Sequence, residues 1–218
     1  RERAVWIDNP RGFIIEPLHR GFIYQAPVSL ALVESNAIRR LVYDPTRFDF
    51  GKVSPPPNTM GDIGFSGFRV LATSGGGEPR EIALFQGASF ARAKAKGQTF
   101  GAISRALSLK TADPRGEEFP FFRAFWIEQP ARDDVLVIHG LLDTESVTGL
   151  YTFTLRVNDI TLMDTEAAIF PRVALDSFGI AGMQATYLHG WTDRRGADEY
   201  RPQVNEVNGL QLIAGNGE

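Results

Sequence analysis

The sequence predicts an all-β protein folded as an antiparallel sandwich or barrel. Its 22 Gly and 13 Pro residues divide the chain into short runs, and these runs favour the β-branched and aromatic residues that suit a pleated, half-buried surface. Helical periodicity is nearly absent. At 218 residues and 43% hydrophobic, the chain can bury a full core, and all-β proteins of this length often form one domain. We therefore expect a single β-sandwich domain over residues 1–218.

The elements follow from these runs in chain order. Apolar, β-rich runs between turn residues predict strands at 20–24, 28–33, 38–43, 67–72, 81–91, 106–110 and 122–127. Residues 134–142 are apolar at both alternating positions, which predicts a central strand buried on both faces. Apolar residues alternate with Thr and Arg over 151–157, so that strand should have one buried and one solvated face. Further strands are predicted at 160–170 and 210–214, and single helical turns at 44–48 and 176–179. Long exposed connections are expected at 53–58, 74–79 and 191–199.

The composition excludes several classes of protein. The net charge is -3 and the pI is about 5.7, with Lys and Arg scattered among the acids, so nucleic acid is not expected as a partner. No apolar run is long enough to span a bilayer, and no membrane span is expected. The absence of Cys excludes disulfides, thiolate catalysis and zinc–thiolate sites. Because the chain begins with Arg1 and shows no signal peptide, an export signal is expected upstream.

Motifs for metals and nucleotides are also missing. His19, His139 and His189 are far apart in the sequence and lack metal-ligand spacing, so no metal and no cofactor are expected. His139 lies in the most apolar strand and is predicted to be a hydrogen-bonded core group. The glycines at 75–77 lack a P-loop lysine, and no nucleophile elbow occurs. Carboxylates would therefore perform any chemistry in this chain.

The most informative stretch is 116–130, which places two adjacent carboxylates beside a dense run of aromatic rings. Sugar rings stack on aromatic faces and hydrogen-bond to carboxylates and Arg, so this stretch predicts a glucan-binding site. The alternative is that these rings belong to the core. A glycosidase needs a pair of carboxylates, one acid and one base. Candidates are Glu117, Glu118, Glu128, Asp143, Asp164, Glu166 and Glu206, and a raised pKa for Glu118, between a turn and Phe119, is one hypothesis.

A set of motifs resembles one family, the osmoregulated periplasmic glucan biosynthesis proteins G and D (MdoG and MdoD). The motifs occur in family order over nearly the whole chain: Asp-Ile-Gly-Phe-Ser-Gly-Phe at 62–68, Gln-Gly-Ala-Ser-Phe at 86–90, Gly-Gln at 97–98, Ser-Arg-Ala-Leu at 104–107, Gly-Glu-Glu-Phe-Pro at 116–120, Phe-Trp-Ile-Glu at 125–128, Leu-Asp at 142–143, Thr-Gly at 148–149, Tyr-Arg-Pro at 200–202 and Gly-Asn-Gly-Glu at 215–218. The resemblance implies a large sandwich of the galactose-mutarotase type. It also implies that this chain is a fragment of the family's N-terminal domain, without the C-terminal immunoglobulin-like domain.

The resemblance further implies a periplasmic protein whose cleft holds β-1,2-linked glucan backbones. Some relatives resemble inverting endo-β-1,2-glucanases or transglycosylases, in which a carboxylate shortly after the Tyr-Arg-Pro motif acts as base and a later segment supplies the acid. The matching position is Glu206, preceded by Asn205, where family members usually have Asp preceded by His. The added methylene displaces the carboxylate by about 1.5 Å, and misplacement on this scale can cost about a hundredfold in rate.

Three hypotheses follow for the function. In the first, the protein is an enzyme with Glu206 as base and with glucan contacts from Arg105, Glu118, Trp126, Tyr200 and Arg201. In the second, it is a non-catalytic glucan-binding scaffold, and in the third its rings all face a core. Arg105 or Arg201 could instead pair with a buried carboxylate such as Glu118. The sequence is compatible with a homodimer. A shared groove for Trp126 and Trp191 would favour the first two hypotheses.

Overall fold

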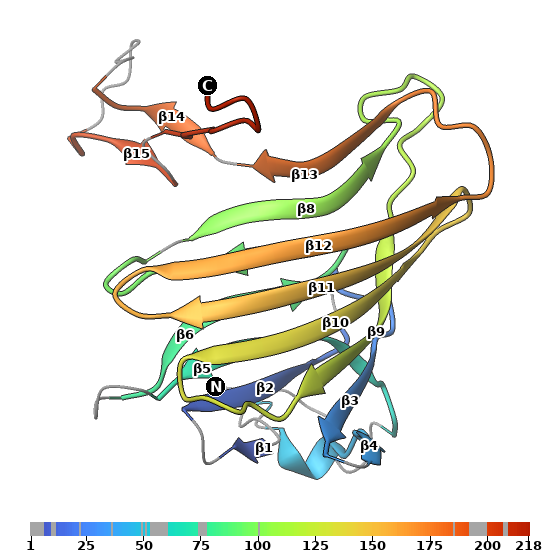
Figure 1. Ribbon diagram of the computed structural model, residues 1–218, viewed down its shortest axis with the longest axis vertical. Coiled ribbons are helices and arrows are strands. Elements are labelled where there is room, and N and C mark those ends of the chain that lie inside the picture. Colours follow the sequence, from blue (N-terminus) through green and yellow to red (C-terminus); the bar gives the residue numbers. More distant parts are fainter. Residues whose placement is uncertain are drawn as a thin grey trace.

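The fold is a sandwich of two β-sheets, seen in a computed structural model of the chain (Figure 1). The structure describes residues 7–9, 12–21, 23–35, 37–48, 50, 52, 61–73, 78–99, 101–184, 186–191, 200–206 and 209–218. Of the predicted connections, 53–58, 74–77 and 192–199 lie outside the described residues. The predicted all-β sandwich is confirmed for the described part of the chain.

Seven strands form the first sheet. Their order is β1 (Ile7–Asn9), β2 (Phe13–His19), β5 (Phe65–Ala72), β6 (Arg80–Gln86), β7 (Phe90–Ala93), β8 (Ala102–Leu109) and β13 (Phe178–Gln184). Each neighbouring pair is antiparallel. Because β13 pairs with β8, a late segment of the chain completes the edge of a sheet built mainly from the first half.

Six strands form the second sheet, which lies in front in Figure 1. Their order is β12 (Thr161–Pro171), β11 (Val147–Val157), β10 (Val135–Asp143), β9 (Phe121–Glu128), β3 (Ser29–Glu34) and β4 (Ala37–Arg40). The β3–β9 pair is parallel, and the other pairs are antiparallel. A short ribbon of β14 (Tyr187–His189) and β15 (Val204–Asn205) lies beyond the end of β13, outside the two stacked sheets (Figure 1).

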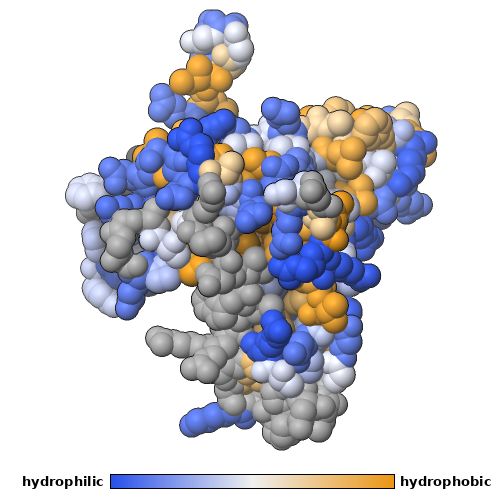
Figure 2. Space-filling view, turned by 60° about the horizontal axis from the view of Figure 1, so that its bottom comes forward, coloured by the Kyte–Doolittle hydropathy of each residue, from blue (hydrophilic) through white to orange (hydrophobic). Residues whose placement is uncertain are grey.

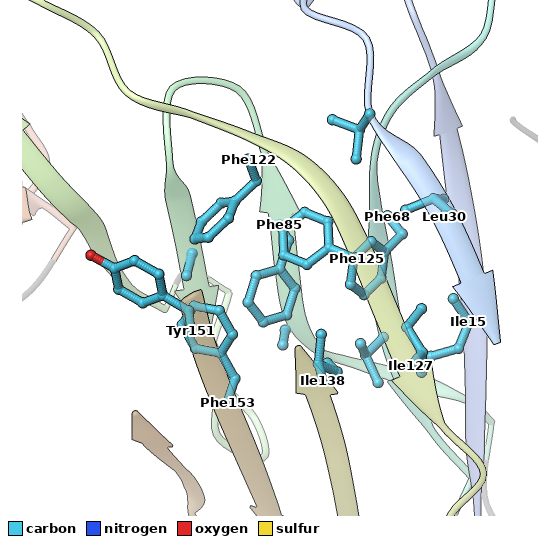
Figure 3. Close-up of a cluster of buried hydrophobic side chains, with 14 of the residues drawn as sticks. Ile15, Leu30, Phe68, Phe85, Phe122, Phe125, Ile127, Ile138, Tyr151 and Phe153 are labelled. Atoms are coloured by element: carbon cyan, nitrogen blue, oxygen red, sulfur yellow. The ribbon is translucent and has the colours of Figure 1, made fainter. Parts of the chain in front are cut away.

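Aromatic rings from both sheets meet in the core (Figure 3). Phe68 of β5 and Phe85 of β6 contact Phe125 of β9, with ring centroids 5.1 and 5.5 Å apart. Phe85 also lies 5.0 Å from Phe153 of β11. None of these four rings is more than 2% exposed. Since such rings bury large apolar areas and gain from edge contacts, this cluster joins the two sheets.

Several predicted elements agree with the structure and others do not. The strands at 28–33, 67–72, 122–127, 151–157 and 160–170 are confirmed as β3, β5, β9, β11 and β12, and the turn at 44–48 is the 3-10 helix η1 (Pro45–Arg47). The single strand predicted at 81–91 is wrong, because a turn at 87–89 divides it into β6 and β7. The predicted strands at 20–24 and 210–214 are absent from these described segments, and 176–179 is not helical but leads into β13.

The expectation that residues 134–142 are buried on both faces is also wrong. Along β10, buried residues such as Leu136 and Ile138 alternate with partly exposed ones. His139 therefore lies on the outer face with 39% of its side chain exposed. It hydrogen-bonds to Glu128 (2.7 Å) and Thr152 (3.1 Å) rather than to core groups. The prediction was wrong because it assumed that the apolar residues on the outer face of β10 would also be buried. In the described chain, no further layer covers that face.

We expect Ile138→Val in the full-length protein to lower the free energy of unfolding by about 1 kcal/mol, because Ile138 is fully buried and loses a methylene's packing. The matched control is Ile160→Val, since Ile160 is 59% exposed; its effect should stay within about 0.5 kcal/mol. Urea unfolding of both variants measures the difference. Equal effects at the two sites would contradict the assignment of Ile138 to the core.

Apolar side chains are also exposed in the last third of the chain. Examples are Phe170, Ile180, Met183 and Leu188, each at least 51% exposed. On the face shown in Figure 2, separate hydrophobic patches lie among hydrophilic residues. In the described ranges, no helix is both long and apolar enough to cross a membrane.

Candidate functional site

The guanidinium of Arg105 lies between two aromatic rings on the seven-stranded sheet. Arg105 of β8 is directly opposite Phe90 of β7 in the strand pairing. Its guanidinium carbon is 5.8 Å from the centroid of Phe90 and 5.1 Å from that of Phe119. Nη1 of Arg105 donates to Oε1 of Glu117 at 2.5 Å, and these side chains are 14% and 21% exposed. A cation held over ring faces and paired with a carboxylate is fixed in position.

A third ring extends this group of side chains. The rings of Tyr24 and Phe90 both lie next to Gly87, which has φ +76. A Cβ atom added at Gly87 would be 3.5 Å from the Tyr24 ring and 3.7 Å from the Phe90 ring. Tyr24 is 40% exposed and Phe119 is 48% exposed. Tyr24, Phe90, Arg105, Glu117 and Phe119 are called the Arg105 platform below.

The platform has unused hydrogen-bonding capacity. Nε and Nη2 of Arg105 are buried and receive no acceptor from the described residues. Buried donors are nearly always paired with protein, water or ligand. Exposed ring faces beside a guanidinium and a carboxylate match the apolar C–H faces and hydroxyl rims of sugars. Chemically, the platform can hold a neutral saccharide.

Glu118 points away from this platform and joins two loops. Its carboxylate accepts hydrogen bonds from Thr144 Oγ1 (2.6 Å), Ser146 N (2.9 Å) and Ser146 Oγ (2.7 Å). Lys110 Nζ lies 3.4 Å away, and 13% of the Glu118 side chain is exposed. Burial alone would raise the pKa of Glu118, but the hydrogen bonds from Thr144, Ser146 and Lys110 more than offset it and lower the pKa to about 2.

Two sequence hypotheses about Glu118 are therefore wrong. Its pKa is lowered rather than raised, and the carboxylate beside Arg105 is that of its neighbour Glu117. Glu118 forms one wall of a pocket of about 430 Å³, in which Lys110 pairs with Glu118 and Arg115 pairs with Asp113. The hydrogen bonds of Glu118 show that it stabilises these loops.

Trp126 lies on a different surface from Arg105. Its neighbours along β9, Phe125 and Ile127, are each 2% exposed and face the core, so Trp126 projects from the outer face of the six-stranded sheet. There it pairs across the strands with His139. The predicted contacts Arg105 and Trp126 are thus on separate sheets, and they do not share one site.

The residues of the Tyr-Arg-Pro motif lie beside the β14–β15 ribbon. Tyr200 is 96% exposed, and the carbonyl of Arg201 accepts a hydrogen bond from His189 Nε2 at 3.2 Å. Trp191, after β14, is 77% exposed. Trp126 is only partly exposed, on a different element, so the described residues provide no evidence for a groove shared by the two tryptophans.

Glu206 is partly exposed and bound to the backbone of the ribbon. Its N–H donates to Thr186 O at 2.9 Å, and its Oε2 accepts from Thr186 N at 2.8 Å. Arg105 is opposite Gly182 in the β8–β13 pairing. Four residues of chain from Gly182 to Thr186 span at most about 14 Å. Thr186 and Glu206 thus follow the Gln184 end of β13, which pairs with Ile103 at the start of β8. Glu118, between the platform residues Glu117 and Phe119, bridges instead to Leu109 at the other end of β8.

The sequence hypotheses did not group four side chains with Arg105: Tyr24, Phe90, Glu117 and Phe119. Glu117 and Phe119 belong to the informative stretch 116–130, so their position next to Glu118 was the available signal. Phe90 is brought to Arg105 by the pairing of β7 with β8, and Tyr24 lies near Phe90 at the turn of Gly87. Across the ranges that the structure describes, no cluster of three or more His, Asp or Glu could hold a metal ion.

Comparison with known proteins shows which family this chain resembles. The sequence profile of the family described as "Periplasmic glucan biosynthesis protein, MdoG" matches residues 1–218. A protein named glucans biosynthesis protein G from Shewanella sp. strain ANA-3 is 43% identical over 219 residues, which cover 99% of this chain and 40% of the relative. Its counterpart in Shewanella baltica strain OS155 is 44% identical with the same coverage. The chain thus spans about 40% of the length of these curated relatives.

Proposed function

Because the chain belongs to the family described as periplasmic glucan biosynthesis protein MdoG, we propose that it binds and processes β-1,2-linked glucan backbones in the periplasm. The relatives' printed names supply the class of polymer. The β-1,2 linkage and the location of this protein are parts of the proposal, and both rest on the motifs at 104–107, 116–120 and 200–202.

The observation that most strongly supports the proposal is the Arg105 platform. The rings of Phe90 and the half-exposed Phe119 lie beside a guanidinium that has unsatisfied donors and pairs with a carboxylate. Stacking and charge-assisted hydrogen bonds of this kind suit an uncharged sugar ring. An anionic polymer is less suited to this platform, because Glu117 already neutralises the guanidinium of Arg105.

The proposed reaction is an inverting cleavage or transfer by an endo-β-1,2-glucanase or transglycosylase. Glu206 is proposed to act as the base that activates water, and the general acid is proposed to come from a later segment of the family's longer chain. In support, Glu206 follows the Tyr-Arg-Pro motif at 200–202, at the position where the resemblance places the base.

A non-catalytic glucan-binding scaffold is the second candidate. One observation favours it: the Glu206 carboxylate already accepts a hydrogen bond from the Thr186 backbone, and Asn205 precedes it in place of His. A scaffold would need the platform but not a correctly placed base. The two candidates share their ligand and differ in turnover.

The test is to incubate the full-length protein with linear β-1,2-glucan and to separate the products by size. Shorter or cyclised chains, released with inverted anomeric configuration, support the enzyme. Binding in calorimetry without new products supports the scaffold. Absence of both binding and products would overturn the proposal.

We expect Arg105→Gln to weaken binding of linear β-1,2-glucan about tenfold, because it removes a charged donor held between two rings. The matched control is Arg132→Gln, since Arg132 pairs with Asp134 in an exposed turn and is 69% exposed. Calorimetric titration of the full-length variants gives the two affinities. Equal losses in both variants, or none in Arg105→Gln, would contradict the role of the platform.

A further inference from the structure

A second pocket lies where strands of both sheets begin or end, apart from the Arg105 platform. It has a volume of about 600 Å³ and is formed by the start of β3, the end of β4 with the residues after it, the start of β5, and β9. The lining residues are Pro27, Val28, Ser29, Arg40, Leu41, Val42, Tyr43, Asp62, Gly64, Phe65 and Arg123. Its volume is in the range of small-molecule sites.

Two arginines of this pocket are without an anionic partner. Arg40 is the last residue of β4, and Arg123 sits at a bulge in β9, where the pairing with β10 shifts between Leu141 and Leu142. Bulges redirect side chains. Both residues are exposed, and within the described chain neither forms an ion pair or a side-chain hydrogen bond; Arg123 only lies 5.8 Å from the Phe121 ring.

Several arginines elsewhere in the described chain pair with carboxylates, and Arg20 and Arg80 donate to backbone carbonyls. Arg39, the neighbour of Arg40 on β4, pairs with Glu34 at 3.0 Å. Arg132 pairs with Asp134 at 2.8 Å. Convergence of two unpaired guanidiniums on one concave surface is therefore a local feature of this pocket, and such groups bind carboxylate or phosphate.

The same pocket contains polar groups that can hydrogen-bond to the hydroxyls of a ligand. Oδ1 of Asp62 accepts from the Gly64 backbone at 2.9 Å, and no described residue donates to its other oxygen. The phenol oxygen of Tyr43 is buried and has no hydrogen-bond partner in the described residues. Burial, then the charges of Asp62 and Asp44, raises the pKa of Tyr43 to about 12, so the phenol keeps its proton as a donor.

The position of Tyr43 is fixed by its neighbours. Its ring stacks on Phe48 with centroids 5.2 Å apart and meets Phe65 edge-on at 5.6 Å. The ring of Tyr43 is therefore fixed in the wall of the pocket, with its phenol oxygen buried. Leu41, Val42 and Phe65 add apolar surface to the same wall.

We propose that this pocket binds a small hydroxylated molecule carrying one anionic group, such as a sugar phosphate or a sugar acid, with the anion on Arg40 and Arg123. Asp62, Ser29 and the apolar wall then recognise the hydroxylated part. The two arginines outweigh the single Asp62 in charge, so an anionic ligand is favoured over a neutral one. This site is independent of the glucan function proposed above.

The experiment is calorimetric titration of the full-length protein with four probes: glucose 6-phosphate, glucuronate, glucose and inorganic phosphate. The variants are Arg40→Gln and Arg123→Gln, with Arg39→Gln as the matched control on the same strand. We expect glucose 6-phosphate or glucuronate to bind at least about tenfold more tightly than glucose or inorganic phosphate. Whichever of the two binds more tightly identifies the anionic group.

Each pocket variant should weaken that binding about tenfold, while Arg39→Gln leaves it unchanged. Binding of the anionic sugar should also persist in the presence of β-1,2-glucan, so that a failure of the glucan proposal would not affect this result. The proposal is overturned if no anionic sugar binds, if inorganic phosphate binds as tightly, or if Arg39→Gln has the same effect as the pocket variants.

Discussion

Replacing Glu206 by Gln is expected to lower the rate of β-1,2-glucan cleavage or transfer by at least about a hundredfold, because a positioned base contributes about 10²–10⁴ in rate. Gln has nearly the same shape but accepts no proton at neutral pH. Affinity for the glucan should change little, since the proposed binding groups are those of the Arg105 platform. Product formation by the full-length protein under saturating glucan gives the rate.

The matched control for Glu206 is Glu166→Gln. Glu166 is an exposed carboxylate on β12, paired across the strands with Thr152, and its replacement should leave the rate within about twofold, as for most surface substitutions. If Glu206→Gln forms products at the unmutated rate, Glu206 is not the base. If the unmutated protein binds glucan but forms no product, the scaffold is the correct candidate.

Replacing Glu118 by Gln is expected to lower the free energy of unfolding by about 2–4 kcal/mol, because three donors from Thr144 and Ser146 lose a charged acceptor. An amide presents its own N–H groups to at least one of these donors. Since Glu118 precedes β9 and its partners lie between β10 and β11, the change loosens two loops together. Urea unfolding of the full-length variant at pH 7 measures the loss.

The control for Glu118 is Glu34→Gln. Glu34 pairs with Arg39 on the surface, with 44% of its side chain exposed, and such pairs contribute less than about 1 kcal/mol. A similar loss in both variants would show that Glu118 is an ordinary surface carboxylate.

The same residue predicts a dependence of stability on pH. The pKa of Glu118 falls from its ordinary value of 4.5 to about 2 on folding, a difference that corresponds to about 3 kcal/mol. Because the folded value is the lower one, this stabilisation is complete above about pH 4.5 and is lost as the pH falls towards 2. The Glu118→Gln variant lacks this carboxylate. Between pH 4.5 and 2 its free energy of unfolding should therefore fall by about 3 kcal/mol less than that of the unmutated protein.

Adjacent residues thus have separate tasks. Glu117 holds the guanidinium of Arg105 on one side of the chain, and Glu118 joins the loops on the other. In an extended segment successive side chains point in opposite directions. The sequence could not show which of the two carboxylates pairs with Arg105; it suggested Glu118, and the structure has Glu117.

Strands with clear alternation could be predicted from the sequence. In β11 the apolar residues alternate with Thr and Arg, and the structure buries the apolar face as expected. The 81–91 segment was not divided correctly, because apolar residues on both sides of Gly87 suggested one continuous strand, whereas Gly87 adopts φ +76 and begins the turn between β6 and β7. The strand β13 was missed because Phe178–Gln184 contains two glycines and gains its stability by pairing with β8.

The sequence by itself determined that the chain is all-β and that its motifs resemble those of one glucan biosynthesis family. These properties can be seen in local patterns of residue type, which do not depend on how the strands are paired. Only the tertiary structure decided that Trp126 and Arg105 lie on different sheets, that Glu117 rather than Glu118 pairs with Arg105, and that Arg40 and Arg123 share a pocket. Those facts depend on register and on pairing between distant strands, where a shift of one residue turns every side chain to the opposite face.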